Sequence, residues 1–301
     1  MTIAELHGKL APDRPMGVSE RLEDLLTSDV FGTMKYAGWE RGFIEWLLNA
    51  EVAPVEPQPP PIEYYLSKSK ITNVEFKFWP RLANGREPDL ALLIRFDLKD
   101  YLLILIEAKY FSRTSDWEVD EETVPFGLTG NQIADQINGL NNMSPKDLFK
   151  WFESTSDSKL ADADVCLEKI HLFITMHNVL PVNDYENSTK QIGNTWPIHA
   201  YWLSWVSLSE CLKKHFGQTD YGLNSLIKDL YDLLHRKGLV PFHGFEMQPW
   251  YSGQKSQFFW DEHYWDLQPL HLDKYRSFWQ SIFWKQQPIG HLTNGLFWEE
   301  G

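Results

Sequence analysis

Apolar residues gather in three closely spaced runs in the first half of the chain, and their patterns predict three consecutive strands. Residues 71–79 alternate in part, residues 89–97 read DLALLIRFD, and residues 101–110 read YLLILIEAKY. The third run is almost unbroken, which is typical of a central strand covered on both faces. The polar stretch 97–100 is short, so we expect the second and third strands to form a hairpin.

Helical spacing of apolar residues precedes these strands. Ser19 is suited to be the N-cap of a helix that begins at Glu20 and carries an apolar side as far as Val30. A second helical pattern covers residues 36–47. The proline-rich stretch 52–61, VAPVEPQPPP, is expected to be an extended connector between these helices and the strands.

The remaining pattern alternates between helices and strands. It predicts a helix over 129–140, strands over 169–176 and 199–205, and a helix over 221–236. The order of helix, three strands, helix, strand, strand and helix indicates an α/β fold in which helices flank a central mixed β-sheet.

Composition and this order suggest three parts. Residues 1–60 hold the N-terminal helices and the connector, which we expect to pack on a core formed by 61–240. Residues 241–301 form an extension dense in tryptophan, tyrosine and phenylalanine. Such density with few interleaved basic residues favours a core or a protein interface, through a protein partner or a second copy, over a surface that stacks bases.

Net charge limits the class of partner. The chain carries −14 at neutral pH, which argues against a protein that coats nucleic acid. Residues 68–113 hold nine basic and six acidic residues, a net +3, so the rest of the chain carries −17. This locally basic segment also contains Asp89, Glu107 and Lys109, the residues with the clearest potential for chemistry.

Cellular location and redox chemistry follow from absences in the sequence. No apolar run reaches the roughly 20 residues needed to span a bilayer, and no basic-then-apolar leader opens the chain. We therefore expect a cytoplasmic protein that does not engage a membrane. Cys166 and Cys211 stand outside any C-x-x-C pair, so neither a disulfide framework nor a structural zinc site is expected.

Polar residues interrupt the most apolar strand at its end. Alternation places Glu107 and Lys109 on one face, where Leu103 and Leu105 are apolar. Burying a carboxylate and an amine is costly unless they are paired or hold a metal. We therefore expect these two side chains to lie at the rim of the sheet in a polar cleft.

The hairpin can bring a second carboxylate to the same face. A three-residue loop at 98–100 would place Asp89 opposite Lys109 and Ala91 opposite Glu107. The three polar side chains would then lie within about 5–8 Å of one another. A loop of even length without a bulge would instead turn Asp89 to the opposite face.

Two carboxylates beside an ammonium suit phosphodiester hydrolysis. Carboxylate oxygens are preferred ligands of Mg²⁺, which keeps several waters when bound. The ammonium can orient the attacking water and offset the charge that develops on the phosphate.

In these residues, Pro88-Asp89 and Glu107-Ala108-Lys109, the chain resembles the PD-(D/E)XK nuclease superfamily, which includes the restriction-endonuclease-like and RecB-like phosphodiesterases. The resemblance implies an αβββαβ core with a mixed sheet. It also implies that Asp89, Glu107 and the Ala108 carbonyl bind Mg²⁺ or Mn²⁺, and that Lys109 is the catalytic lysine.

Two further groups follow from the same resemblance. A glutamate on the first helix would complete the metal site, for which Glu23 is chosen and Glu20 is the reserve. Gln132, one turn before Gln136, would be the glutamine that RecB-like members carry on the helix after the catalytic strand. The aromatic partner usual in that motif is absent at Gln136.

The resemblance implies a Mg²⁺-dependent deoxyribonuclease, in bacterial phage defence or repair, with DNA as its partner. Two alternatives remain at this stage: a catalytically silent interaction module on the same fold, and a nuclease effector that is active only in complex with a partner.

Ordinary structural roles also remain open for single residues. Glu107 and Lys109 could be a surface pair, Glu23 could compensate the helix dipole, and the two glutamines could face solvent. His171 is expected to be a hydrogen-bonded structural residue and Asn131 a surface residue.

Overall fold

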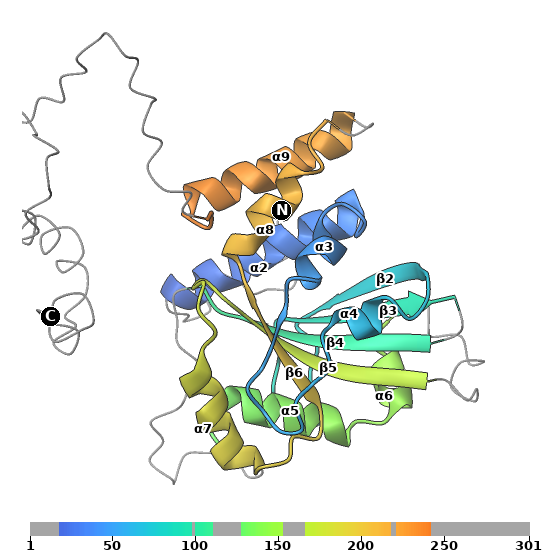
Figure 1. Cartoon of the computed structure of the whole chain (residues 1–301), viewed down its shortest axis with the longest axis vertical. Coiled ribbons are helices and arrows are strands. Elements are labelled where there is room, and N and C mark those ends of the chain that lie inside the picture. The colour runs from blue at the N-terminus through green and yellow to red at the C-terminus, as the bar shows by residue number, and fades with distance from the viewer. Residues whose placement is uncertain (1–17, 98–99, 111–127, 153–165, 218–220, 242–301) are drawn as a thin grey trace, which may run out of the picture. The chain divides into compact units, whose positions relative to one another are not determined.

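The computed structural model describes residues 18–97, 100–110, 128–152, 166–217 and 221–241 (Figure 1). The chain divides into two units, residues 1–242 and 243–301, and every described residue lies in the first. The aromatic-rich extension therefore lies, apart from Pro241, outside the described residues.

A six-stranded mixed sheet forms the centre of the first unit. Its spatial order is β1-β6-β5-β4-β3-β2. The strands are β1 (Glu51–Val52), β2 (Ile71–Phe78), β3 (Leu90–Phe96), β4 (Asp100–Ala108), β5 (Cys166–Thr175) and β6 (His199–Ser204). Strands β4, β5 and β6 run parallel, whereas β1, β2 and β3 are antiparallel to their neighbours. The carboxyl ends of β4, β5 and β6 consequently meet at one edge of the sheet.

Helices cover both faces of this sheet (Figure 1). One face packs against α2 (Val18–Ala37), α3 (Phe43–Leu47), α8 (Val206–Lys213) and α9 (Tyr221–Arg236). The other face packs against α5 (Gln132–Asn142), α6 (Pro145–Phe149) and α7 (Val182–Ile192). The short helix α4 (Glu63–Leu66) adds Tyr65 and Leu66 to the first layer.

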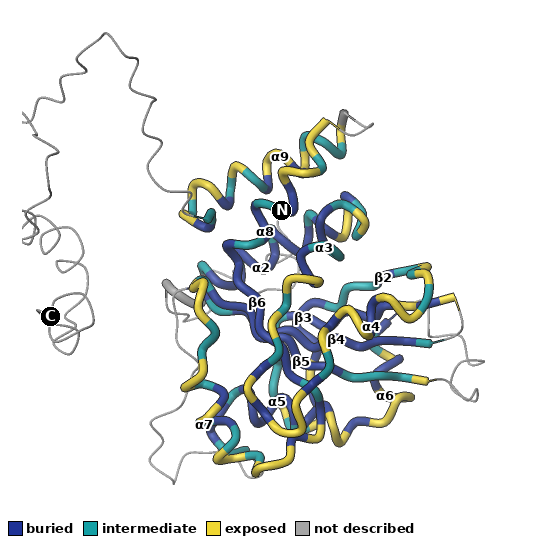
Figure 2. The backbone as a smooth tube through the Cα atoms, in the orientation of Figure 1, coloured by how far each residue is buried: buried dark blue, intermediate teal, exposed yellow. Residues whose placement is uncertain are grey.

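Alternate residues of the central strands feed two separate cores. In β4, Leu102, Ile104 and Ile106 face the layer that contains α2, whereas Leu103 and Leu105 face the layer that contains α5. Both faces exclude water, so β3 and β4 are buried along nearly their whole length (Figure 2). This explains why residues 101–106 are an unbroken apolar run rather than an alternating one.

The α/β class with a helix-flanked mixed sheet agrees with the prediction, and the differences lie at the N-terminus. Helix α2 begins at Val18, so Ser19 is inside the helix and not its N-cap. The expected second helical pattern over 36–47 is interrupted by Gly38 and Gly42, with φ of +98° and +87°. Positive φ cannot continue a right-handed helix, so only the short α3 forms from that pattern.

In the part of the chain that the structure describes, no helix has the length and apolar character needed to cross a bilayer.

A buried ion pair fixes the start of α5 against the strand layer. Asp135 is 1% exposed, and its Oδ2 accepts hydrogen bonds from Nε and Nη2 of Arg86 at 2.9 and 2.5 Å. Its Oδ1 accepts from the backbone N–H and the hydroxyl of Thr129 at 2.7 and 2.8 Å. Because Arg86 lies in the loop between β2 and β3, the pair sets how α5 presents its side chains to the sheet.

Replacing Arg86 by methionine is therefore expected to lower the free energy of unfolding by about 3–5 kcal/mol, because the buried Asp135 carboxylate loses its cation. Urea denaturation near neutral pH measures the change. Lys150→Ala is the control, since Lys150 pairs with Asp147 in solvent and is 66% exposed. The control should leave the unfolding midpoint unchanged, and an equal shift in both variants would contradict the role given to the buried pair.

Candidate active site

The register of the β3–β4 hairpin brings Asp89 level with Glu107. Leu90 pairs with Ile106, so the residue that precedes β3 lies beside the residue that follows Ile106. The hydrogen bond from the Ala108 backbone N–H to Asp89 Oδ2, at 2.8 Å, fixes this arrangement.

The predicted register is wrong by two residues. Ala91 pairs with Leu105 rather than with Glu107, and Asp89 is not opposite Lys109. The reason is the position of the turn: Tyr101 pairs with Arg95 rather than with Asp97, so the chain reverses one residue earlier than predicted. Because Arg95 and Asp97 are two positions apart, the shift leaves Asp89 with the parity of Ala91 and Glu107, which is the parity that the prediction required.

Asp89 is half-buried, in a position that disfavours the charged form of its carboxyl. Burial raises the pKa of its carboxyl well above the ordinary value, and the neighbouring Glu107 charge, with a smaller contribution from Asp24, raises it further. Lys109 and the hydrogen bond from Ala108 lower that pKa but do not cancel the rise. The negative charge of the carboxylates around Asp89 is therefore larger than Lys109 and the Ala108 N–H compensate.

Glu107 is the most enclosed carboxylate of the site, at 1% exposure. Its Oε1 accepts from Gln132 Nε2 at 2.5 Å and from Lys109 Nζ at 2.8 Å. Its Oε2 accepts from Gln136 Nε2 at 2.5 Å. Gln136 is fully buried, Gln132 is half-buried and both donate to Glu107, so the alternative of a solvated glutamine face is wrong. The side chains of Glu107 and Lys109 are 2% and 13% exposed, so the alternative of a surface pair is wrong as well.

Lys109 is held as a cation among carboxylates. Its side chain is 13% exposed, and its Nζ lies 3.7 Å from Glu23 Oε1 as well as 2.8 Å from Glu107 Oε1. Burial lowers its pKa, but the charges of Glu107, Asp89 and Glu23 outweigh burial and raise the pKa above the usual lysine value. Lys109 is therefore a cation near neutral pH.

Glu23 belongs to the site through the backbone that follows β4. Its Oε2 accepts the backbone N–H of Tyr110 at 3.1 Å, and the residue is 8% exposed. It lies beyond the first turn of α2, which begins at Val18, so compensation of the helix dipole does not explain its place. The side chain of Glu20, the reserve choice, is outside the described residues.

Sequence reasoning missed Asp24. This carboxylate, 6% exposed, acts electrostatically on Asp89 from helix α2. The signal was two consecutive acids, Glu23 and Asp24, in an otherwise apolar stretch of the helix, but the sequence alone did not show that both are buried.

The donor set fits a divalent cation by chemistry and by charge. Four carboxylates among the described residues (Glu23, Asp24, Asp89 and Glu107) interact with Lys109 or with one another. Hard oxygen donors of this kind suit Mg²⁺ or Mn²⁺. Within the described ranges, however, no three His, Cys, Asp or Glu side chains lie close enough together to surround a metal ion as they stand.

Asn131 departs from its predicted surface position. It is 6% exposed and caps the N-terminus of α5, with its Oδ1 accepting from the Ala134 backbone N–H at 2.9 Å. His171, expected to be a hydrogen-bonded structural residue, is fully buried on β5 and contacts Gln136.

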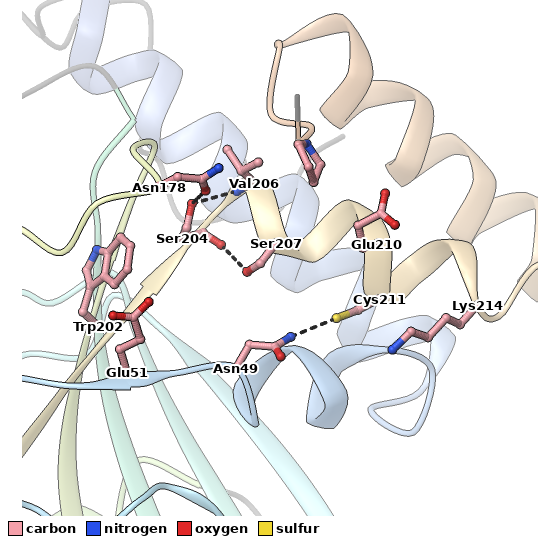
Figure 3. A pocket seen from close by; sticks show the side chains of 11 residues that line it. Asn49, Glu51, Asn178, Trp202, Ser204, Val206, Ser207, Glu210, Cys211 and Lys214 are labelled. Atoms are coloured by element: carbon pink, nitrogen blue, oxygen red, sulfur yellow. Dashed lines mark hydrogen bonds between the residues drawn. The ribbon is translucent and has the colours of Figure 1, made fainter. Parts of the chain in front are cut away.

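A separate cavity of about 430 Å³ opens at the carboxyl end of β6 (Figure 3). Its lining includes Ser204, Asn178 and the carboxylates Glu51 and Glu210, with Lys214 at one side. None of the predicted site residues lines it. The two carboxylates disfavour a phosphate there, so this cavity is not the candidate active site.

Comparison with known proteins does not place the chain in a family: no family model, curated protein or solved structure matches it.

Proposed function

We propose that the chain is a metal-dependent nuclease of the PD-(D/E)XK type that hydrolyses phosphodiester bonds of DNA. The observation that carries the proposal is the meeting of Asp89, Glu107 and Lys109 at the end of β4. Glu107 and Lys109 lie 18 and 20 positions after Asp89 in the sequence, and the β3–β4 hairpin brings them close to it.

The element order supports the same proposal. A helix, α2, precedes three antiparallel strands, β2, β3 and β4, and a helix, α5, leads into a strand parallel to β4. Among the described elements this order is compatible with the αβββαβ core that the resemblance implies, with α3, β1 and α4 inserted after the first helix and α6 between α5 and β5.

Asp89 and Glu107 would hold Mg²⁺ or Mn²⁺, with the Ala108 carbonyl and Glu23 as further oxygen donors. The bound ion would supply Lewis acidity and an acidified water. Lys109 would remain protonated and neutralise negative charge on the phosphate as it develops. Gln132 and Gln136 hold the Glu107 carboxylate in place by donating to its two oxygens.

A cleavage assay tests the proposal. Plasmid and linear DNA are incubated with the full chain and Mg²⁺ or Mn²⁺, beside Lys109→Ala, Asp89→Ala and the exposed control Lys150→Ala. Cleavage by the wild type and the control, lost in both site variants, is the expected result. Equal nicking by all four proteins would assign the activity to a contaminant and overturn the proposal.

Silence of the wild type with both metals would instead favour an interaction module or an effector that depends on a partner. The acidic charge of −17 outside residues 68–113 is the feature that such a partner would offset.

A further inference from the structure

A fully buried histidine, His171, is linked to the candidate active site through Gln136. His171 lies in the middle of β5, level with Leu105 of β4 and Ala200 of β6. Its Nε2 is 3.0 Å from Gln136 Oε1, while its Nδ1 is buried without a hydrogen-bond partner. The other end of the same Gln136 amide binds Glu107.

The hydrogen bonds determine the polarity of this chain of three side chains. A carboxylate accepts hydrogen bonds, so the group 2.5 Å from Glu107 Oε2 must be the NH₂ of Gln136. The amide oxygen then faces His171 and requires an N–H from the ring. His171 is therefore the neutral tautomer with its proton on Nε2 and a bare lone pair on Nδ1.

The surroundings of His171 keep it in that tautomer. A proton added at Nδ1 would find no acceptor among the described residues, and the leucine and alanine neighbours on β4 and β6 offer no charge. Burial accordingly lowers the pKa of His171 to about 3. The ring stays a fixed donor over the whole range in which ordinary histidines titrate.

We propose that His171 is a positioning residue of the active site, whose Nε2–H orients the Gln136 amide so that its NH₂ holds Glu107 Oε2. A free amide can rotate by half a turn and present its oxygen to the carboxylate, which would repel it. The histidine removes that option and leaves Glu107 Oε1 directed toward Lys109 and Gln132. The catalytic consequence of this role rests on the proposed nuclease function, whereas the hydrogen-bond polarity does not.

The tautomer itself is the first test and needs no activity. Nitrogen-15 NMR of the full chain should show the His171 ring protonated at Nε2 only, with no titration between about pH 5 and pH 8. A proton on Nδ1, or a titration near the ordinary histidine pKa of about 6.5, would overturn the proposal.

Variants test the effect on the site. His171→Leu should weaken Mn²⁺ binding or lower the turnover number by about tenfold or more, which is the loss typical of residues that orient a metal ligand. Calorimetry measures the Mn²⁺ binding. His171→Gln, which keeps a donor near the position of Nε2, should stay within about threefold of wild type. A merely structural residue would show no such rescue, because leucine fills the apolar space at least as well.

A double-mutant cycle isolates the route through Gln136. If His171 acts through that amide, the double variant with His171→Leu and Gln136→Leu should be no worse than Gln136→Leu alone. Additive losses, or a His171→Leu protein that folds, binds Mn²⁺ as tightly as wild type and turns over as fast, would contradict the proposal. Should the wild type neither bind Mn²⁺ nor cleave DNA, the nuclease assignment fails, and the tautomer measurement still decides the role of His171.

Discussion

Replacing Lys109 by methionine is expected to lower the rate of DNA cleavage by about 10²–10³-fold, the loss typical when one group that stabilises transition-state charge is removed. The same change should also lower the free energy of unfolding by about 3 kcal/mol, because the buried Glu107 carboxylate loses its ion-pair partner. Single-turnover cleavage and urea denaturation near neutral pH measure the two effects.

Lys109→Arg separates charge from position in this experiment. Arginine keeps the cation beside Glu107 and Glu23, so most of the stability should return. Its wider, planar head group cannot take the place of an ammonium at a reacting phosphate, so activity should recover only in part. Cleavage by Lys109→Met at the wild-type rate would exclude the role assigned to this lysine.

Replacing Asp89 by asparagine is expected to have opposite effects on activity and stability. Cleavage should fall by about 10³-fold, because a metal-binding carboxylate is lost. The free energy of unfolding near neutral pH should rise by about 0.5–2 kcal/mol, as for other substitutions that relieve strain at a functional site. Asparagine removes the charge that burial and Glu107 disfavour, yet its amide oxygen can still accept the Ala108 N–H.

The pH dependence of this gain has a definite sign. The pKa of Asp89 is raised in the folded protein, so its protonation stabilises the fold fully below the unfolded value of about 3.9. That contribution is lost as the pH rises through the higher folded pKa, and the charged carboxyl then destabilises the fold. The advantage of asparagine should therefore be largest near neutral pH and shrink on acidification.

Asp97→Asn is the matched control for the Asp89 variant, because Asp97 is exposed at the other end of the same strand pair. It should change neither the cleavage rate nor the unfolding midpoint. A destabilised Asp89→Asn protein that retains wild-type activity would refute both the electrostatic strain and the catalytic role.

Strand alternation predicted which face Asp89 occupies but not its register. The face of Asp89 is the same whether Arg95 or Asp97 pairs with Tyr101, because these two residues are two positions apart. Which of them pairs depends on where the chain reverses, here one residue earlier than predicted. Pattern alone does not contain that information.

The environment of Glu107 could be predicted only in part. The spacing of Gln132 and Gln136 showed that they share one side of a helix, but not which side faces the sheet. That rotation is set by distant contacts, including the Arg86–Asp135 pair and the Asn84 amide, which occupies the space beside Gly139. His171 gave a weak signal, as the one titratable side chain within the apolar sequence IHLFIT.

The most direct test of the central claim is anomalous diffraction from crystals of the protein soaked in Mn²⁺. We expect one strong anomalous peak at the end of β4, with carboxylate oxygens of Asp89 and Glu107 about 2 Å from the ion. The Asp89→Asn protein, treated in the same way, should lack that peak. A peak that persists unchanged in the variant, or Mn²⁺ bound only elsewhere in the wild type, would contradict a metal site built from these two carboxylates.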